Sequence, residues 1–144
     1  MSVPGYKLLP HTTDAYIQAT GSTLEEAFEY AGVALFDTMC DLKYISPDLV
    51  ENVEVSAADE VTLLHNWLES LLLKFELEGK VYSRFQVTLN RRPSNRLQAN
   101  AKIYGEPYER RKHGAKVEVK AVTIHKMEIS RNGAMTTVRF ILDL

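Results

Sequence analysis

Two short acidic segments, one near each end of the sequence, hold the residues best suited to chemistry. Asp14 closes the polar run His11-Thr12-Thr13-Asp14 and leads into an alternating, strand-like segment. Asp143 stands beside the terminal carboxylate of Leu144. Two anionic groups so close together repel each other unless a cation or a basic side chain joins them. Because calcium and magnesium take carboxylate oxygens as ligands, these residues are candidates for binding a hard cation.

Each acidic segment also has a purely structural explanation. Asp14 can be explained as an aspartate that forms a turn before a strand. The carboxylates of Asp143 and Leu144 can be explained as two solvated charges. Other chemistries find little support, because the sequence has no phosphate-binding Gly-Lys-Ser/Thr loop and no Cys or His spacing typical of zinc. Cys40 follows an apolar helical pattern, so we interpret it as a small buried hydrophobe. His113 belongs to a basic loop and is expected to be exposed.

Two helices are expected from apolar residues that recur at steps of three and four. The first pattern covers residues 24–39, and a capping box that begins at Ser22 marks its start. The second covers residues 61–75, with Asp59 as the N-cap and Gly79 as the terminator.

The rest of the chain alternates apolar and polar residues, which is typical of strands. The expected strands contain Ala15 to Ala19, Val53 to Val55, Phe85 to Leu89, Leu97 to Ile103, Val117 to Ala121 and Val138 to Leu142. The alternation places Lys120 and Asp143 on the faces opposite the apolar residues. The pattern predicts one α+β domain over residues 1–144, a two-layer domain in which a largely antiparallel sheet has two main helices packed on one face.

Composition places the chain among ordinary globular proteins. It has 144 residues, 45% hydrophobic and 25% charged, which suits a single domain. No apolar run approaches the roughly 20 residues that a membrane-spanning helix needs. The first ten residues lack the charged start and the apolar stretch of a signal peptide. We therefore expect a soluble, cytoplasmic protein with no membrane association.

The net charge of −2 hides a basic segment between Lys80 and Lys120. This segment has eleven basic and three acidic residues, a local charge of +8. It is suited to guiding phosphates or an acidic partner, although a solvated strand face and loop explain it as well. Aromatic residues are not interleaved with the charges at stacking positions, which disfavours an autonomous RNA-binding module.

Several ordered motifs resemble the archease family along nearly the whole chain. These motifs are His11-Thr12-Thr13-Asp14, Thr23 to Phe28, Leu35 to Met39, Gly105 to Tyr108 followed by Arg110 and His113, Glu118 to Ala121, and Ile141 to Leu144. The chain departs from the family at Pro10, where an acidic residue often precedes the His-Thr pair, and at Thr123-Ile124-His125, where the family usually has Thr-Tyr.

The resemblance implies a non-enzymatic accessory protein. Archeases assist the ligase that joins RNA ends bearing a 3′ or cyclic phosphate to a 5′-hydroxyl in tRNA splicing, and they promote guanylylation of that ligase and its repeated turnover. The resemblance also implies a divalent cation, seen as calcium, bound by Asp14, Asp143 and Leu144, and it associates Lys120 and His11 with activation. RNA would then be contacted indirectly, through the ligase.

Two other functions compete with ligase activation. The chain could be an assembly or specificity factor for another RNA-processing enzyme, such as a tRNA methyltransferase, a role also linked to archeases. It could instead be a metal-dependent hydrolase that uses Asp14 and Asp143, although no persuasive general base or nucleophile stands beside these carboxylates.

Overall fold

The structure of the protein is a computed structural model, and it describes residues 3–9 and 14–144. In chain order the elements are β1 (Gly5–Leu9), β2 (Ala15–Gly21), α1 (Leu24–Met39), the 3-10 helix η1 (Leu42–Tyr44), β3 (Leu49–Ala57), α2 (Glu60–Glu78), β4 (Lys80–Arg91), β5 (Leu97–Pro107), α3 (Arg110–His113), β6 (Ala121–Asn132) and β7 (Met135–Asp143).

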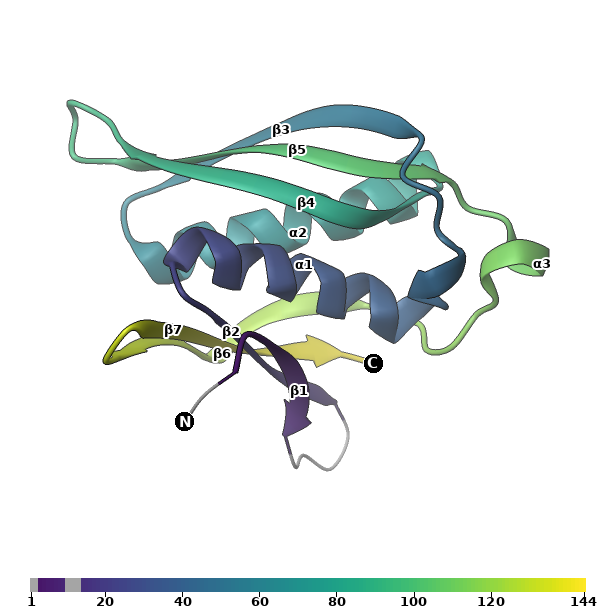
Figure 1. Cartoon of the computed structure of the whole chain (residues 1–144), viewed down its shortest axis with the longest axis horizontal. Coiled ribbons are helices and arrows are strands. Elements are labelled where there is room, and N and C mark those ends of the chain that lie inside the picture. Colours follow the sequence, from purple (N-terminus) through teal and green to yellow (C-terminus); the bar gives the residue numbers. More distant parts are fainter. Residues whose placement is uncertain (1–2, 10–13) are drawn as a thin grey trace.

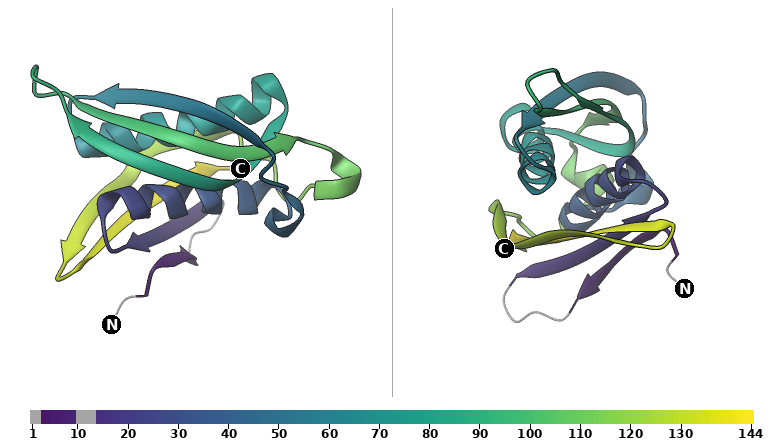
Figure 2. Two further views of the ribbon diagram at one scale, coloured as in Figure 1. Left: turned by 45° about the horizontal axis from the view of Figure 1, so that its top comes forward. Right: turned by 90° about the vertical axis from the view of Figure 1, so that its left-hand side faces the viewer.

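The described strands form two antiparallel sheets, and the two long helices lie between them. The lower sheet of Figure 1 has the strand order β1-β2-β7-β6, and the upper sheet has the order β3-β5-β4. Helix α1 contacts β4 of the upper sheet and β2 and β7 of the lower sheet, and α2 contacts all three upper strands and β6. The end-on view in Figure 2 shows the resulting order of layers: sheet, helices, sheet.

The expected α+β class, with two main helices and antiparallel strands, is confirmed. The strands form two sheets where one was expected, so the domain has three layers instead of two. The physical reason lies in the helices. The consecutive residues Ala34, Leu35 and Phe36 of α1 are all buried, which a helix covered on one side only does not show. Because α1 is apolar on two sides, it is buried when one sheet covers each of these sides.

Local side-chain caps set the helix ends. Thr23 is the N-cap of α1 and accepts a hydrogen bond from the backbone N–H of Glu26, while the Glu26 carboxylate accepts one from Ser22 N–H. The capping pair therefore lies one residue later than the sequence indicated. Asp59 caps the start of α2, and Gly79 ends that helix in the left-handed conformation at φ 64°, as expected.

Aromatic side chains join the helices to the upper sheet. The Phe85 ring of β4 stacks on Phe36 at 6.1 Å and meets the edge of Trp67 at 6.0 Å. The buried Trp67 indole N–H donates to the carbonyl of Phe28, which ties α2 to α1. Such ring pairs contribute about 0.5–1.5 kcal/mol each beyond the area they bury. The upper sheet and both helices are thus held as one rigid unit.

Strand β6 begins later than the sequence indicated. Val117 and Val119 were expected to start it, but the strand starts at Ala121. Val119 is buried, whereas Val117 is 43% exposed. The preceding segment is held to the end of α1, because Lys116 N–H donates to the Met39 carbonyl. Among the described residues, no helix is long and apolar enough to cross a membrane.

Candidate functional site

Four of the five site residues predicted from the sequence lie at one end of the lower sheet. Asp14 directly precedes β2, and Asp143 is the last residue of β7. The pairing of these strands ends with Ala15 opposite Leu142, so Asp14 and Asp143 both lie at this end of the sheet.

Lys120 is held at the same end by the backbone. Its N–H donates to the carbonyl of Asp143 at 2.7 Å, and β6 continues the pairing with Ala121 opposite Asp143. The Lys120 side chain is exposed, as its place opposite the apolar residues predicted. Leu144 is half-buried and packs against the core. His11, the fifth predicted residue, lies outside the described residues.

The Asp143 carboxylate is exposed and accessible to a ligand. Within residues 3–9 and 14–144, neither this carboxylate nor the Lys120 ammonium takes part in an ion pair or a side-chain hydrogen bond. Both charges are thus free to act on a bound ion or on a docked partner.

The donor chemistry at this end suits a hard cation, but the side chains alone do not complete a site. No group of three or more His, Cys, Asp or Glu side chains that could hold a metal occurs in the described part of the chain. Asp14 and Asp143 supply two carboxylates, whereas calcium takes 6–8 oxygens. A cation held here would draw its other ligands from the terminal carboxylate of Leu144, from water or from a partner.

A cavity of about 510 Å³ opens beside this end, and both Asp14 and Leu144 line it. Asp37 of α1 also lines the cavity; it accepts a hydrogen bond from the Tyr6 hydroxyl at 2.7 Å and forms an ion pair with Lys116 at 3.1 Å. Burial, followed by the hydrogen bond to Asp37, raises the pKa of Tyr6 to about 12, so the phenol stays a neutral donor at physiological pH. These contacts fasten β1 and the segment before β6 to α1.

The sequence analysis assigned no role to Tyr6, Asp37 or Lys116. Asp37 belongs to the Leu35 to Met39 motif, so the motif marked its position but not its partners. Tyr6 and Lys116 are 31 and 79 residues from Asp37 in the sequence. No spacing rule connects residues so far apart.

A second polar cluster turns out to be structural. His113 was expected to be exposed, but it is fully buried; that expectation is wrong. The His113 ring stacks on Tyr108 at 5.7 Å, and its Nδ1 accepts the backbone N–H of Glu109. The proton is therefore on Nε2, which donates to Glu106 at 2.8 Å. The Gly-Glu-Pro-Tyr motif and its following histidine thus lock the turn around α3.

Glu106 is the acceptor at the centre of this cluster. Its carboxylate accepts hydrogen bonds from the Ser46 backbone N–H at 2.8 Å and from the Lys112 ammonium at 2.9 Å, in addition to His113. Burial alone would raise the pKa of Glu106, but the hydrogen bonds from Lys112, Ser46 and His113 outweigh it and lower the pKa to about 2. The ionised form is therefore the one that the fold stabilises.

We expect Glu106→Gln to lower the free energy of unfolding at pH 7 by about 1–3 kcal/mol, because it removes a charged acceptor from several donors. The folded-state pKa lies below the ordinary 4.5, so this stabilisation is complete above about pH 5 and is lost as the pH falls toward 2. Urea unfolding of both proteins from pH 7 to pH 3 measures the gap. Glu109→Gln, an exposed neighbour, is the control. A gap that stays constant down to pH 3 would contradict this account.

Comparison with known proteins identifies relatives over nearly the whole chain. Residues 6–144 match the model of the Archease protein family (MTH1598/TM1083). The chain is 34% identical over 139 residues to the protein archease of Sulfurisphaera tokodaii, an alignment that covers 96% of this chain and 98% of the relative. It is 40% identical over 121 residues to the protein archease of Pyrococcus abyssi, covering 84% of each.

Solved structures show the same fold. Protein 1598 of Methanobacterium thermoautotrophicum has a TM-score of 0.87 and 35% identity, with 97% of this chain and 99% of that one covered. An archease and possible chaperone from Thermotoga maritima has a TM-score of 0.62 at 19% identity, with 96% of each chain covered. The second likeness concerns the fold alone.

Proposed function

The chain belongs to the archease family, and on this premise we propose that it activates an RNA-splicing ligase. In this role it promotes guanylylation of the ligase and its multiple turnover in tRNA splicing, and it makes and breaks no covalent bond itself. RNA is contacted through the ligase during ligation. The partner is a protein, so the working part of this chain is a surface and not an enclosed active site.

One observation carries this proposal to particular residues: the backbone hydrogen bond from Lys120 to Asp143. It joins the Glu-Val-Lys-Ala segment to the closing segment of the chain. Asp14 comes to the same end because it directly precedes β2, which pairs with β7. Motifs that lie far apart in sequence therefore supply one end of the lower sheet. We propose that this end docks beside the metal and nucleotide pocket of the ligase.

We propose further that Asp14, Asp143 and the terminal carboxylate of Leu144 hold a divalent cation, with calcium as the first candidate. When bound, the cation neutralises the clustered carboxylates and offers open coordination positions to a partner. Lys120 supplies an exposed ammonium at the same edge, suited to an anionic phosphate or carboxylate on the partner. Such a surface is complete only in the complex.

A pulldown with the full chain as bait tests the choice of partner. We expect the RNA-splicing ligase at a stoichiometry near one to one, and we expect Asp143→Asn to reduce its recovery. A tRNA methyltransferase recovered at the same stoichiometry, with no ligase, would support the assembly-factor role instead. Glu76→Gln, which changes an exposed carboxylate on α2, is the matched control.

A further inference from the structure

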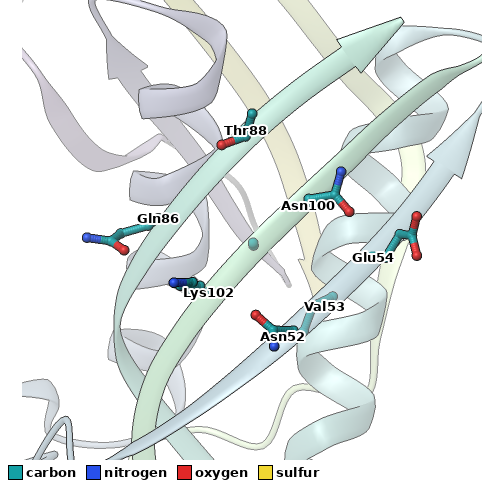
Figure 3. Close-up of a pocket in the computed structure, with 8 residues that line it drawn as sticks. Asn52, Val53, Glu54, Gln86, Thr88, Asn100 and Lys102 are labelled. Atoms are coloured by element: carbon teal, nitrogen blue, oxygen red, sulfur yellow. The ribbon is translucent and has the colours of Figure 1, made fainter. Parts of the chain in front are cut away.

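The outer face of the upper sheet, turned away from the helices, carries a regular array of polar side chains. In the strand register, Asn52 lies opposite Lys102 and Lys102 opposite Gln86; in the next row Glu54, Asn100 and Thr88 are aligned in the same way. Figure 3 shows these side chains standing on three adjacent strands. A shallow hollow of about 550 Å³ lies over them. We call this surface the amide face.

The amide face continues into a row with an aromatic ring. Tyr104 lies opposite Arg84 in the register, and the Arg84 guanidinium sits over the Tyr104 ring at 4.9 Å from its centroid. The Tyr104 hydroxyl donates to the side-chain oxygen of Gln86, which fixes the ring beside the amides. An aromatic residue therefore does stand among the basic residues. It is not interleaved with them in sequence; strand pairing brings it there.

Most polar groups of the amide face are not used by the fold. Within the described residues, the side chains of Asn52, Asn100 and Lys102 make no hydrogen bond or ion pair. They remain solvated donors and acceptors, carried by the hydrogen-bonded strands of the sheet. Because the backbone that carries them is already ordered, binding a ligand here costs less conformational entropy than binding it on a mobile loop.

The charge of the amide face favours a polyanion. Arg84 and Lys102 lie on it, and the exposed turn between β4 and β5 adds Arg92 and Arg96. Among the described residues that line the hollow, Glu54 is the one with a carboxylate. This carboxylate lies 3.9 Å from the Arg92 guanidinium, so the two charges offset each other. Phosphate groups would thus meet a positive surface along the length of the strands.

We propose that the amide face binds single-stranded RNA directly, in addition to the contact that the ligase makes during ligation. The choice of RNA over other polyanions rests on the proposed function. A base stacks on the pair that Arg84 and the Tyr104 ring form, phosphates lie against Lys102 and the arginines of the turn, and the amides hydrogen-bond base edges. A positive groove with a stacking ring is the combination that single strands use. An acidic peptide could pair with the basic residues and the amides, but it supplies no base to stack on the aromatic ring.

The test is fluorescence anisotropy of a labelled ten-nucleotide RNA with the isolated full chain. We expect saturable binding that weakens with salt. Tyr104→Ala should weaken it by about 5-fold to 150-fold, the range for loss of one base stack, and Tyr104→Phe should retain it. Circular dichroism checks that Tyr104→Ala is folded. If that variant unfolds, the lysine pair described next decides the question.

A matched pair of lysine variants separates the amide face from general charge. Lys102→Gln removes a cation from the amide face, and Lys126→Gln removes an exposed one from β6 of the other sheet. We expect only Lys102→Gln to weaken binding and to reduce the salt slope by about 0.7, the value for one phosphate of a single strand. Equal effects of the two variants would overturn the proposal.

Two further outcomes would also overturn it. One is wild-type protein that does not bind the RNA. The other is Lys102→Gln that binds RNA normally but binds the ligase less tightly, which would make the amide face a protein-docking surface. Neither result would contradict the proposed activation of the ligase, because ligase turnover with added protein is measured separately. Conversely, RNA binding that depends on Tyr104 and Lys102 would stand even if the chain failed to activate the ligase.

Discussion

Asp143→Asn is expected to abolish most calcium binding and ligase activation while the protein stays folded. Asp143 is exposed at the end of β7, so the substitution removes little packing, and its backbone carbonyl still accepts the Lys120 N–H. The loss of one carboxylate from a site with so few should weaken calcium binding by at least about tenfold, since even changes to residues behind metal ligands weaken binding 10–100-fold.

Changes at the last residue should give smaller effects in a fixed order. Deleting Leu144 moves the terminal carboxylate onto Asp143 and alters the ligand geometry. Adding a short tag keeps Asp143 but turns the terminal carboxylate into a neutral carbonyl, which calcium also accepts. We expect Asp143→Asn to be the most severe, the deletion intermediate and the tag mildest. Because Leu144 packs against the core, the thermal stability of the deletion variant must be measured alongside.

Calcium titration by calorimetry and multiple-turnover ligation should follow this same order. Glu76→Gln controls for the loss of a carboxylate elsewhere on the surface. If the deleted and tagged proteins both bind calcium and activate like the wild type, the terminal carboxylate is not a ligand. If Asp143→Asn also binds calcium normally, the proposed metal site is wrong.

Lys120→Ala is expected to impair ligase activation strongly without affecting the fold. The Lys120 side chain is exposed, and an exposed substitution away from the core changes stability by no more than about 0.5 kcal/mol. Lys120 contacts Asp143 through its backbone N–H, and alanine retains this hydrogen bond. Any loss of activity must then come from the missing ammonium.

Thermal denaturation and ligase turnover should be measured on the same preparation of Lys120→Ala. Lys126→Ala, which changes another exposed lysine, is the control. We also expect Lys120→Arg to restore part of the activity, since it returns a positive charge at the same edge. Wild-type activation by Lys120→Ala, or a loss that tracks unfolding, would remove Lys120 from the proposed mechanism.

The helices could be predicted closely because the information that forms them is local. Apolar steps of three and four, Asp59 before α2 and Gly79 after it all lie within a turn or two of the elements they define. The division into two sheets could not be predicted, because strand order depends on pairs such as Ala15 with Leu142. Strand β1 was missed, since Gly5–Leu9 is exposed at its middle positions and lacks clear alternation.

The candidate site shows the same division. Strand alternation predicted that Lys120 is exposed, and the structure confirms it. The placement of Lys120 against Asp143 came from the pairing of β6 with β7, which no sequence pattern indicated. The fully buried His113 was misinterpreted because its basic neighbours suggested solvent, whereas its stacking on Tyr108 and its bond to Glu106 exist only in the folded loop.

Multiple-turnover RNA ligation by the cognate ligase, with and without this protein, tests the central claim most directly. RNA substrate in large excess over the ligase distinguishes one round of joining from many. We predict that the ligase alone stops near one product per enzyme and that adding the protein restores continued turnover with faster guanylylation. Ligation that proceeds at the same rate and to the same extent in its absence would contradict the account.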